Sequence, residues 1–305
     1  MSNLHTFLKG LAMGAADIVP GISGGTIAFI TGIYDTLLES IRRVNPSLFS
    51  IIKQHGMKHA FHHINGTFLI LLFSGILTSI FTFAQLITWM LDNHPIPLWS
   101  FFFGLIIVSV IHMLKQVKQW QLTRVISLTL GVLFAYGITV LHPINMEPTY
   151  LNMLLAGAIA ICAMILPGIS GSFILLLLGM YGPLLVAAKS FDVITLITFA
   201  LGCLIGLLSF SHLLSWLLRK YRDLALTFLT GLMIGTLNKI WPWKEVVTWR
   251  INSSGKQVPL IEQNLSPFAF EQITGTPALI VYAIIAAILG FIAVWGLEKF
   301  ADKTT

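Results

Sequence analysis

The chain has 305 residues, of which 56% are hydrophobic and only 10% are charged, and its mean hydropathy is +0.86. A soluble domain of this length cannot bury so much apolar surface, so the composition excludes that class and predicts an integral membrane protein. The formal net charge of +6 does not indicate a nucleic-acid partner, because the basic residues lie between apolar segments and form no continuous stripe.

In chain order, the first half is expected to begin with a helical hairpin that enters the membrane and returns to the same side, at about residues 10–40. An amphipathic helix on the membrane interface is expected at about residues 46–65, where apolar residues alternate with lysines and histidines. Apolar stretches close to the roughly 20 residues of a spanning helix follow at residues 67–91, 98–114 and 125–141.

The second half is expected to repeat this order. A second re-entrant hairpin is expected at about residues 157–188, and further apolar stretches lie at residues 193–218, 224–237 and 277–297. An extracytoplasmic loop at about residues 239–276 separates the last two stretches. The stretch at 224–237 is short, so its ends are poorly defined by hydropathy alone.

An internal repeat supports this division. The sequence Pro-Gly-Ile-Ser-Gly occurs at residues 20–24 and again at residues 167–171, an offset of 147. Later matches, such as Trp89 with Trp216, have an offset of 127, and a weaker match has an offset of 159. We therefore expect two membrane repeats, which cover residues 1–145 and 146–305.

The placement of lysine and arginine predicts the orientation of the repeats, since cytoplasmic loops collect these residues. If both hairpins are re-entrant, thirteen of the eighteen basic residues lie on one side of the membrane. Each repeat then crosses the membrane three times, and this odd number inverts the second repeat relative to the first. The sequence predicts an all-α integral membrane protein with an inverted-topology repeat, a common build of secondary transporters, and with both termini cytoplasmic.

The repeated motif is expected to break a helix inside the membrane, because Pro20 and Pro167 lie within apolar segments. A helix that restarts after such a break directs unpaired N–H groups and its positive dipole end into the break, which favours an anion. The alternative is that the glycines only allow helices to pack closely. The candidate substrate-binding residues are Gly21, Ser23, Gly24, Gly25, Thr26, Gly168, Ser170, Gly171 and Ser172.

Three carboxylates are candidates for coupling or gating. Asp17 lies deep in an apolar segment, near the carboxyl end of the first half-helix, where a proton or a cation would relieve its charge. A proton or sodium gradient is therefore a candidate driving force, and the alternative is that Asp17 caps neighbouring backbone. Asp35 and Glu39 lie near the exit of the hairpin and have an interfacial position as their alternative role.

Two further pairs of residues correspond between the repeats. Arg42 and Lys189 each follow a hairpin and are candidates for attracting phosphate headgroups, against ordinary snorkelling to the interface. Gln85 and His212 lie in the middle of spanning helices, where they are expected to face a cavity or a partner helix. No cofactor or metal site is expected, although three histidines at residues 55, 59 and 63 have helical spacing.

Enzymatic functions are weaker alternatives. Residues 21–25 fit the G-x-S-x-G pattern of a serine hydrolase, with His112 or His212 as the distant histidine, but the second copy of the motif ends in Ser172. A lipid phosphatase would need acidic residues and an arginine beside the phosphate, and neither motif contains an arginine. A carrier or channel for a small soluble anion would use the same half-helix site as a lipid transporter, so it stays open.

The two motifs, at residues 14–26 with 32–34 and at residues 166–173 with 179–181, resemble those of the bacterial polyprenyl-phosphate transporters of the PopT type, formerly classed as a domain of unknown function. The resemblance implies a flippase in the bacterial plasma (inner) membrane that returns undecaprenyl phosphate, a carrier lipid of cell-wall biogenesis, from the outer to the cytoplasmic leaflet. It also implies a polyprenyl-phosphate lipid and membrane lipids as partners, and a homo-oligomer is a candidate assembly.

Overall fold

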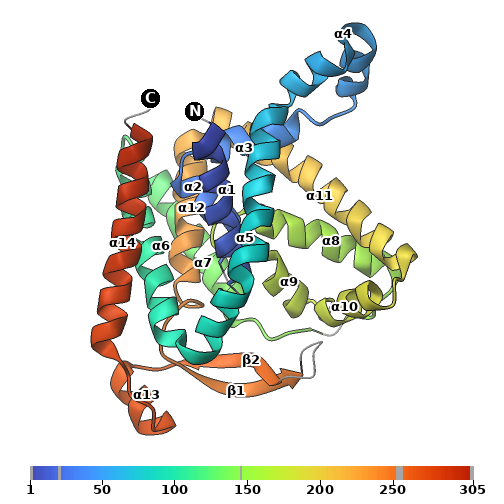
Figure 1. The fold of residues 1–305 in the computed structure, drawn as a ribbon. Coiled ribbons are helices and arrows are strands. Elements are labelled where there is room, and N and C mark those ends of the chain that lie inside the picture. The colour runs from blue at the N-terminus through green and yellow to red at the C-terminus, as the bar shows by residue number, and fades with distance from the viewer. Residues whose placement is uncertain (1–2, 20–21, 145, 252–256, 303–305) are drawn as a thin grey trace.

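The computed structural model describes residues 3–19, 22–144, 146–251 and 257–302. The predicted site residues Pro20 and Gly21 lie outside these ranges. The first repeat contains seven helices: α1 (Asn3–Ile18), α2 (Gly24–Ile30), α3 (Tyr34–Arg42), α4 (Ser47–His63), α5 (Gly66–Asn93), α6 (Pro95–Gln116) and α7 (Leu122–Val140). Figure 1 shows them in blue and green.

The second repeat contains seven more helices and a two-stranded sheet. The helices are α8 (Tyr150–Ile165), α9 (Gly171–Leu177), α10 (Tyr181–Lys189), α11 (Val193–Lys220), α12 (Arg222–Thr236), α13 (Pro267–Thr274) and α14 (Ile280–Asp302). The strands β1 (Lys244–Ile251) and β2 (Gln257–Asn264) pair antiparallel. This sheet corrects the all-α expectation, because the loop at residues 239–276 folds into a β-hairpin followed by a short helix.

Four helices in the described ranges, α5, α6, α7 and α11, are long and apolar enough to cross a membrane. The other two predicted spanning stretches give shorter apolar helices. Helix α12 has 15 residues, and the described apolar part of α14 covers Ile280–Gly296. The broken pair α9–α10 also has the composition of a membrane segment, but its two helices are bent by 106°.

The helix boundaries recur at the offsets found in the sequence. Helices α8, α9 and α10 begin and end 147 residues after α1, α2 and α3, and α11 begins and ends 127 residues after α5. The turn after α2 and the turn after α9 each use a glycine, Gly32 at φ +70° and Gly179 at φ +72°, since this left-handed conformation disfavours other residues. The same type of glycine turn therefore follows α2 and α9.

Helix packing repeats as well. Within each repeat, α1 packs along α5 and α8 packs along α11. Between the repeats, α6 packs along α14 and α7 packs along α12. Glycines allow these close approaches: a Cβ added at Gly104 would overlap the carbonyl of Ala287, and one at Gly231 would overlap the carbonyl of Leu128. These two contacts are equivalent in the repeat, because Gly231 lies 127 residues after Gly104 and Ala287 lies 159 residues after Leu128.

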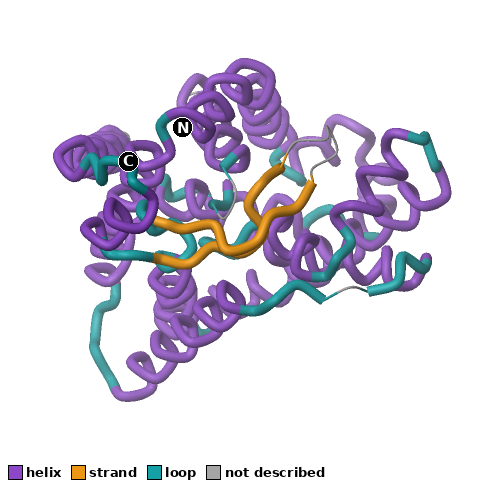
Figure 2. Tube along the Cα trace, turned by 90° about the horizontal axis from the view of Figure 1, so that it is seen from below, coloured by secondary structure: helices purple, strands orange, loops and turns teal. Residues whose placement is uncertain are grey.

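The two ends of the molecule differ. The N-terminus, the C-terminus and α4, which projects from the bundle, lie at one end, whereas the β1–β2 hairpin and α13 lie at the other (Figure 1). Viewed from that second end, the hairpin crosses the base of the helices (Figure 2). Helix α4 is kinked at Gly56, so the amphipathic segment expected at residues 46–65 is two short helices in sequence.

We expect Gly231→Ala to destabilise the protein, because its methyl group must displace the Leu128 carbonyl and separate α12 from α7. Overpacking of this kind costs about 1–3 kcal/mol. Gly137→Ala is the matched control, since no atom lies within 4 Å of its added Cβ and alanine favours a helix. Thermal denaturation in detergent should show a lower midpoint for Gly231→Ala alone; equal midpoints for the two variants would contradict this packing.

Candidate functional site

The two helix breaks meet inside the bundle. The Ser23 hydroxyl, at the start of α2, donates a hydrogen bond of 2.7 Å to the carbonyl of Met164, near the end of α8. In the reverse direction, the Gly168 amide donates to the Thr26 hydroxyl at 2.8 Å. Ser23 and Thr26 are fully buried. Motif residues that are more than 140 positions apart therefore form one site, in which side chains of the first break satisfy polar backbone groups of the second.

Close packing explains several of the motif glycines. A Cβ at Gly25 would lie 2.5 Å from the carbonyl oxygen of Ile165, and one at Gly171 would lie 2.7 Å from that of Ala160. The buried Tyr34 hydroxyl donates to the same Ile165 carbonyl at 3.1 Å. For Gly25 and Gly171, the close-packing alternative is thus supported by direct contacts, whether or not they also bind a substrate.

Asp17 occupies the amino end of α2. Its Oδ1 atom accepts a hydrogen bond of 2.6 Å from the Gly24 amide, and the Ser23 hydroxyl accepts one of 3.0 Å from the Gly25 amide. The Thr26 amide donates to the Ser23 carbonyl at 2.9 Å. The expectation of unpaired N–H groups at this tip is therefore wrong for the conformation described, because Asp17 caps the backbone, as the alternative for that residue proposed. A role of Asp17 in coupling stays a prediction.

The amino end of α9 differs from that of α2. Met164 stands at the position equivalent to Asp17, so this position offers no carboxylate to the tip. The Ser170 and Ser172 hydroxyls bond to each other at 2.8 Å, and no acceptor among the described residues pairs with the amides of Gly171 or Ser172. Gly168, Ser170, Phe173, Thr236 and Lys239 help to line a small pocket here of about 10 Å³, which is room for about one water molecule.

A cluster of charged residues that sequence patterns do not predict adjoins this pocket through Lys239. Lys239, which follows α12, lies with its Nζ 3.0 Å from Oε2 of Glu262 on β2. The Nζ of Lys244 on β1 lies 3.6 Å from the same oxygen and 4.0 Å from the centre of the Trp99 ring. These residues fall in the loop that lacks a counterpart in the first repeat, so neither the repeat nor hydropathy indicates them.

The pKa values in this cluster follow from burial and from the pairing. Burial lowers the pKa of Lys244 to about 8, and Lys239 adds to this effect while Glu262 opposes it. Burial acts to raise the pKa of Glu262, but the positive charges of Lys244 and Lys239 outweigh it and hold that pKa below its ordinary value. The cluster therefore holds an ionised carboxylate between two lysines.

Ion pairs join the helices at the opposite end of the molecule. Glu39 binds Arg42 at 2.6 Å and Arg219 at 3.2 Å, and Asp35 binds Arg222 at 3.0 Å. The hydrogen bond from Arg42 is the main reason that the pKa of Glu39 falls to about 2. The two carboxylates that were candidates for gating thus tie α3 to α11 and α12.

The remaining predicted site residues lie apart from the two breaks. Gln85 and His212 are exposed on α5 and α11, and neither lines the pockets described here; the ring nitrogen Nδ1 of His212 lies 2.7 Å from the carbonyl of Leu208 on its own helix. Their role in lining a cavity stays a prediction. Arg42 is engaged by Glu39, and Lys189 is exposed at the end of α10, so headgroup attraction by this pair also stays a prediction.

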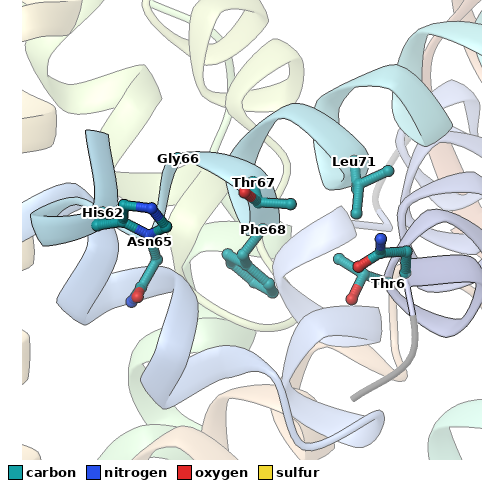
Figure 3. Close-up of a pocket in the computed structure, with 8 residues that line it drawn as sticks. Thr6, His62, Asn65, Gly66, Thr67, Phe68 and Leu71 are labelled. Atoms are coloured by element: carbon teal, nitrogen blue, oxygen red, sulfur yellow. The ribbon is translucent and has the colours of Figure 1, made fainter. Parts of the chain in front are cut away.

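A larger pocket of about 310 Å³ lies between the start of α1 and the junction of α4 with α5 (Figure 3). It contains none of the predicted site residues. Its lining comes from Asn3, Thr6, His62, Asn65, Gly66, Thr67, Phe68 and Leu71. Within the described ranges, no group of three or more histidine, cysteine, aspartate or glutamate side chains has the geometry of a metal site.

We expect Lys244→Met to change how stability depends on pH. Below pH 8 the lysine is charged in both states and its burial disfavours folding, whereas between pH 8 and about 10.5 only the unfolded chain keeps the proton. Stability of the wild type should therefore rise across that window by up to roughly 3 kcal/mol. Melting temperatures of both proteins at pH 7.5 and 10 test this: a difference between them that does not change with pH would contradict the burial of a titrating lysine.

Known proteins place the chain in a family. It is 65% identical over 303 residues, which cover 99% of this chain and 98% of the relative, to a polyprenyl-phosphate transporter of Vibrio cholerae serotype O1. It is 28% identical over 271 residues, 80% of this chain and 89% of the relative, to a polyprenyl-phosphate transporter of Staphylococcus aureus. No solved structure gives a significant match.

The model of the undecaprenyl phosphate translocase-like family matches residues 13–258, a range that includes both helix breaks and most of the β-hairpin. Both relatives are named as transporters and not as enzymes. With its four spanning-length apolar helices, the chain is a multi-pass membrane protein. The resemblance seen in the two motifs is therefore confirmed, and the chain belongs to the undecaprenyl phosphate translocase-like family.

Proposed function

We propose that this protein is a flippase that moves undecaprenyl phosphate, or a related polyprenyl phosphate, from the outer to the cytoplasmic leaflet of the bacterial plasma membrane, so that the carrier lipid is used again. The observation that carries the proposal is the near full-length identity of 65% to a protein named polyprenyl-phosphate transporter. The meeting of two broken helices inside the bundle supports it, because irregular backbone at membrane depth is typical of transporter binding sites.

The proposed topology is an inverted repeat with two re-entrant hairpins and both termini in the cytoplasm. Packing between the repeats supports it, because α6 packs on α14 and α7 packs on α12, as expected for two related halves that face each other. The bend of 106° between α9 and α10 fits a chain that returns to the side from which it entered. In this orientation α4 lies on the cytoplasmic side and the β-hairpin on the outer side.

The phosphate headgroup is proposed to bind first at the tip of α9, where the amides of Gly171 and Ser172 have no described acceptor and the residue equivalent to Asp17 is Met164. The polyprenyl tail stays in the bilayer beside the helices, so the protein shields only the charged group. The tip of α2 becomes available when Asp17 leaves the Gly24 amide. Protonation of Asp17, or a sodium ion beside it, would neutralise the carboxylate and favour that exchange.

Lipid movement in proteoliposomes tests the function. We expect wild-type protein to move undecaprenyl phosphate between leaflets under a proton or sodium gradient. Ser23→Ala combined with Ser170→Ala should slow this movement about tenfold or more, since hydrogen bonds that involve a charged group contribute about 1.5–3 kcal/mol. Ser109→Ala is the matched control, because that buried hydroxyl bonds only to the Leu105 carbonyl of its own helix.

The same assay separates the alternatives. Asp17→Asn should keep downhill movement but lose its response to the gradient, since the amide side chain still accepts from Gly24 and carries no charge to neutralise. Competition by excess inorganic anions, but not by lipid phosphate, would instead favour a carrier for small soluble anions. If the folded wild type moves no lipid under either gradient, the proposed function is wrong.

Cysteine labelling in cells tests the topology, in a background without the two native cysteines. We expect Asn3→Cys and Ser50→Cys, both at exposed positions, to react only from the cytoplasm, because a re-entrant hairpin returns the chain to the side where it started. Ser190→Cys and Glu271→Cys should react only from outside. Labelling of positions 3 and 50 from opposite sides would show that the first motif segment spans the membrane, and would rule out the inverted arrangement.

A further inference from the structure

The cluster of Lys239, Lys244 and Glu262 contains two positive side chains and one negative side chain. Both lysines approach the same oxygen, Oε2 of Glu262, at 3.0 and 3.6 Å, so one carboxylate serves two cations. At 3.6 Å the Lys244 ammonium is beyond hydrogen-bond distance, and it has no hydrogen-bond partner among the described residues although its side chain is only 6% exposed. A buried ammonium without a hydrogen bond is costly, so a further anion at this place would be stabilised.

Position connects this charge to the proposed binding site. Lys239 lines the pocket at the tip of α9 together with Gly168 and Ser170, and its ammonium lies 5.3 Å from the centre of the Phe173 ring on α9. Its side chain is 21% exposed, so it is also accessible to solvent. Lys239 is therefore accessible to an anion and also borders the pocket at the tip of α9.

The hairpin holds the cluster in place. The indole of Trp243 donates to the Ala278 carbonyl at 2.7 Å, and that of Trp241 donates to the Leu265 carbonyl at 2.8 Å. The pocket beneath has room for about one water and not for a phosphate, so the structure shows the site closed. In this closed state the carboxylate of Glu262 occupies the place beside Lys239 that an incoming anion would take.

We propose that Lys239 and Lys244 form the outer receiving site for a phosphate monoester, and that Glu262 substitutes for this phosphate while the site is empty. The proposal rests on the function proposed above and names residues that recognise its substrate. The phosphate displaces the Glu262 carboxylate from Lys239 and gives Lys244 its missing hydrogen-bond acceptor. Glu262 thereby keeps two lysines close together in the absence of lipid and competes with weakly bound anions.

Binding to the purified full-length protein tests the proposal, with farnesyl phosphate as a short lipid phosphate. Lys239→Gln should weaken its affinity about tenfold or more, because a charge-assisted hydrogen bond is lost. Glu262→Gln should tighten binding, because the internal competitor is removed. Lys118→Gln, which removes the same charge from an exposed loop outside the cluster, should leave affinity unchanged.

The opposite signs separate recognition from a structural role. If Lys239 and Glu262 only stabilise the hairpin, both variants break the same ion pair and shift affinity in the same direction, and that result overturns the proposal. Melting temperatures control for folding, and Lys239→Arg provides a second variant that keeps the charge and should keep binding. A wild type that binds farnesyl phosphate no better than farnesol also overturns the proposal.

Two further arms identify the source of the phosphate and distinguish the site from the function. Inorganic phosphate that competes as well as farnesyl phosphate would keep the lysines as ligands but overturn the lipid as their source. In proteoliposomes, Lys239→Gln should raise the apparent KM for undecaprenyl phosphate more than it lowers the maximal rate. If wild type moves the lipid and Lys239→Gln leaves this KM unchanged, the proposed receiving site is wrong and the proposed function stands. If farnesyl phosphate binds through Lys239 but wild type moves no lipid, the receiving site stands and the proposed function is wrong.

Discussion

The structure depends on how side chains of one broken helix satisfy the backbone of the other. A break inside an apolar medium leaves N–H and C=O groups without partners, and water is not there to supply them. Here the Ser23 hydroxyl reaches the Met164 carbonyl, and the Gly168 amide reaches the Thr26 hydroxyl. The second break therefore cannot be buried at low cost without the first, and the helix pairs formed between the repeats hold the two breaks at the same place.

The amino ends of α2 and α9 are not equivalent, because they carry different side chains. Asp17 supplies a carboxylate to the tip of α2, whereas its counterpart Met164 supplies none to the tip of α9. A helix tip that already holds an internal anion rejects a second one until the first is neutralised or moves. In the proposed mechanism, a phosphate bound at α9 advances only after Asp17 is neutralised or moves, which would link lipid movement to a proton or to sodium.

Sequence patterns predict the repeat and the two helix breaks, because proline, glycine and serine recur in register within two apolar segments. They do not predict what fills a break: Asp17 meets an amide seven residues ahead, and that contact depends on the angle between α1 and α2. Hydropathy also locates α12 closely, because the predicted stretch at residues 224–237 differs from the helix Arg222–Thr236 by two residues at its start and one at its end. Neither the repeat nor hydropathy indicates the cluster around Glu262, since long-range pairing across a hairpin that exists in one repeat leaves no periodic signal.

That hairpin and helix α4 also make the two ends of the molecule different. A scaffold of two inverted repeats would present similar faces to both sides of the membrane, and would favour neither leaflet as the source of its substrate. Helix α4 is inserted in the first repeat and the β-hairpin in the second, and they lie at opposite ends of the molecule (Figure 1). Lys239, at the hairpin end, lies beside the α9 break, where Met164 replaces Asp17, so in the proposed mechanism this end receives the anion while the α2 tip is closed.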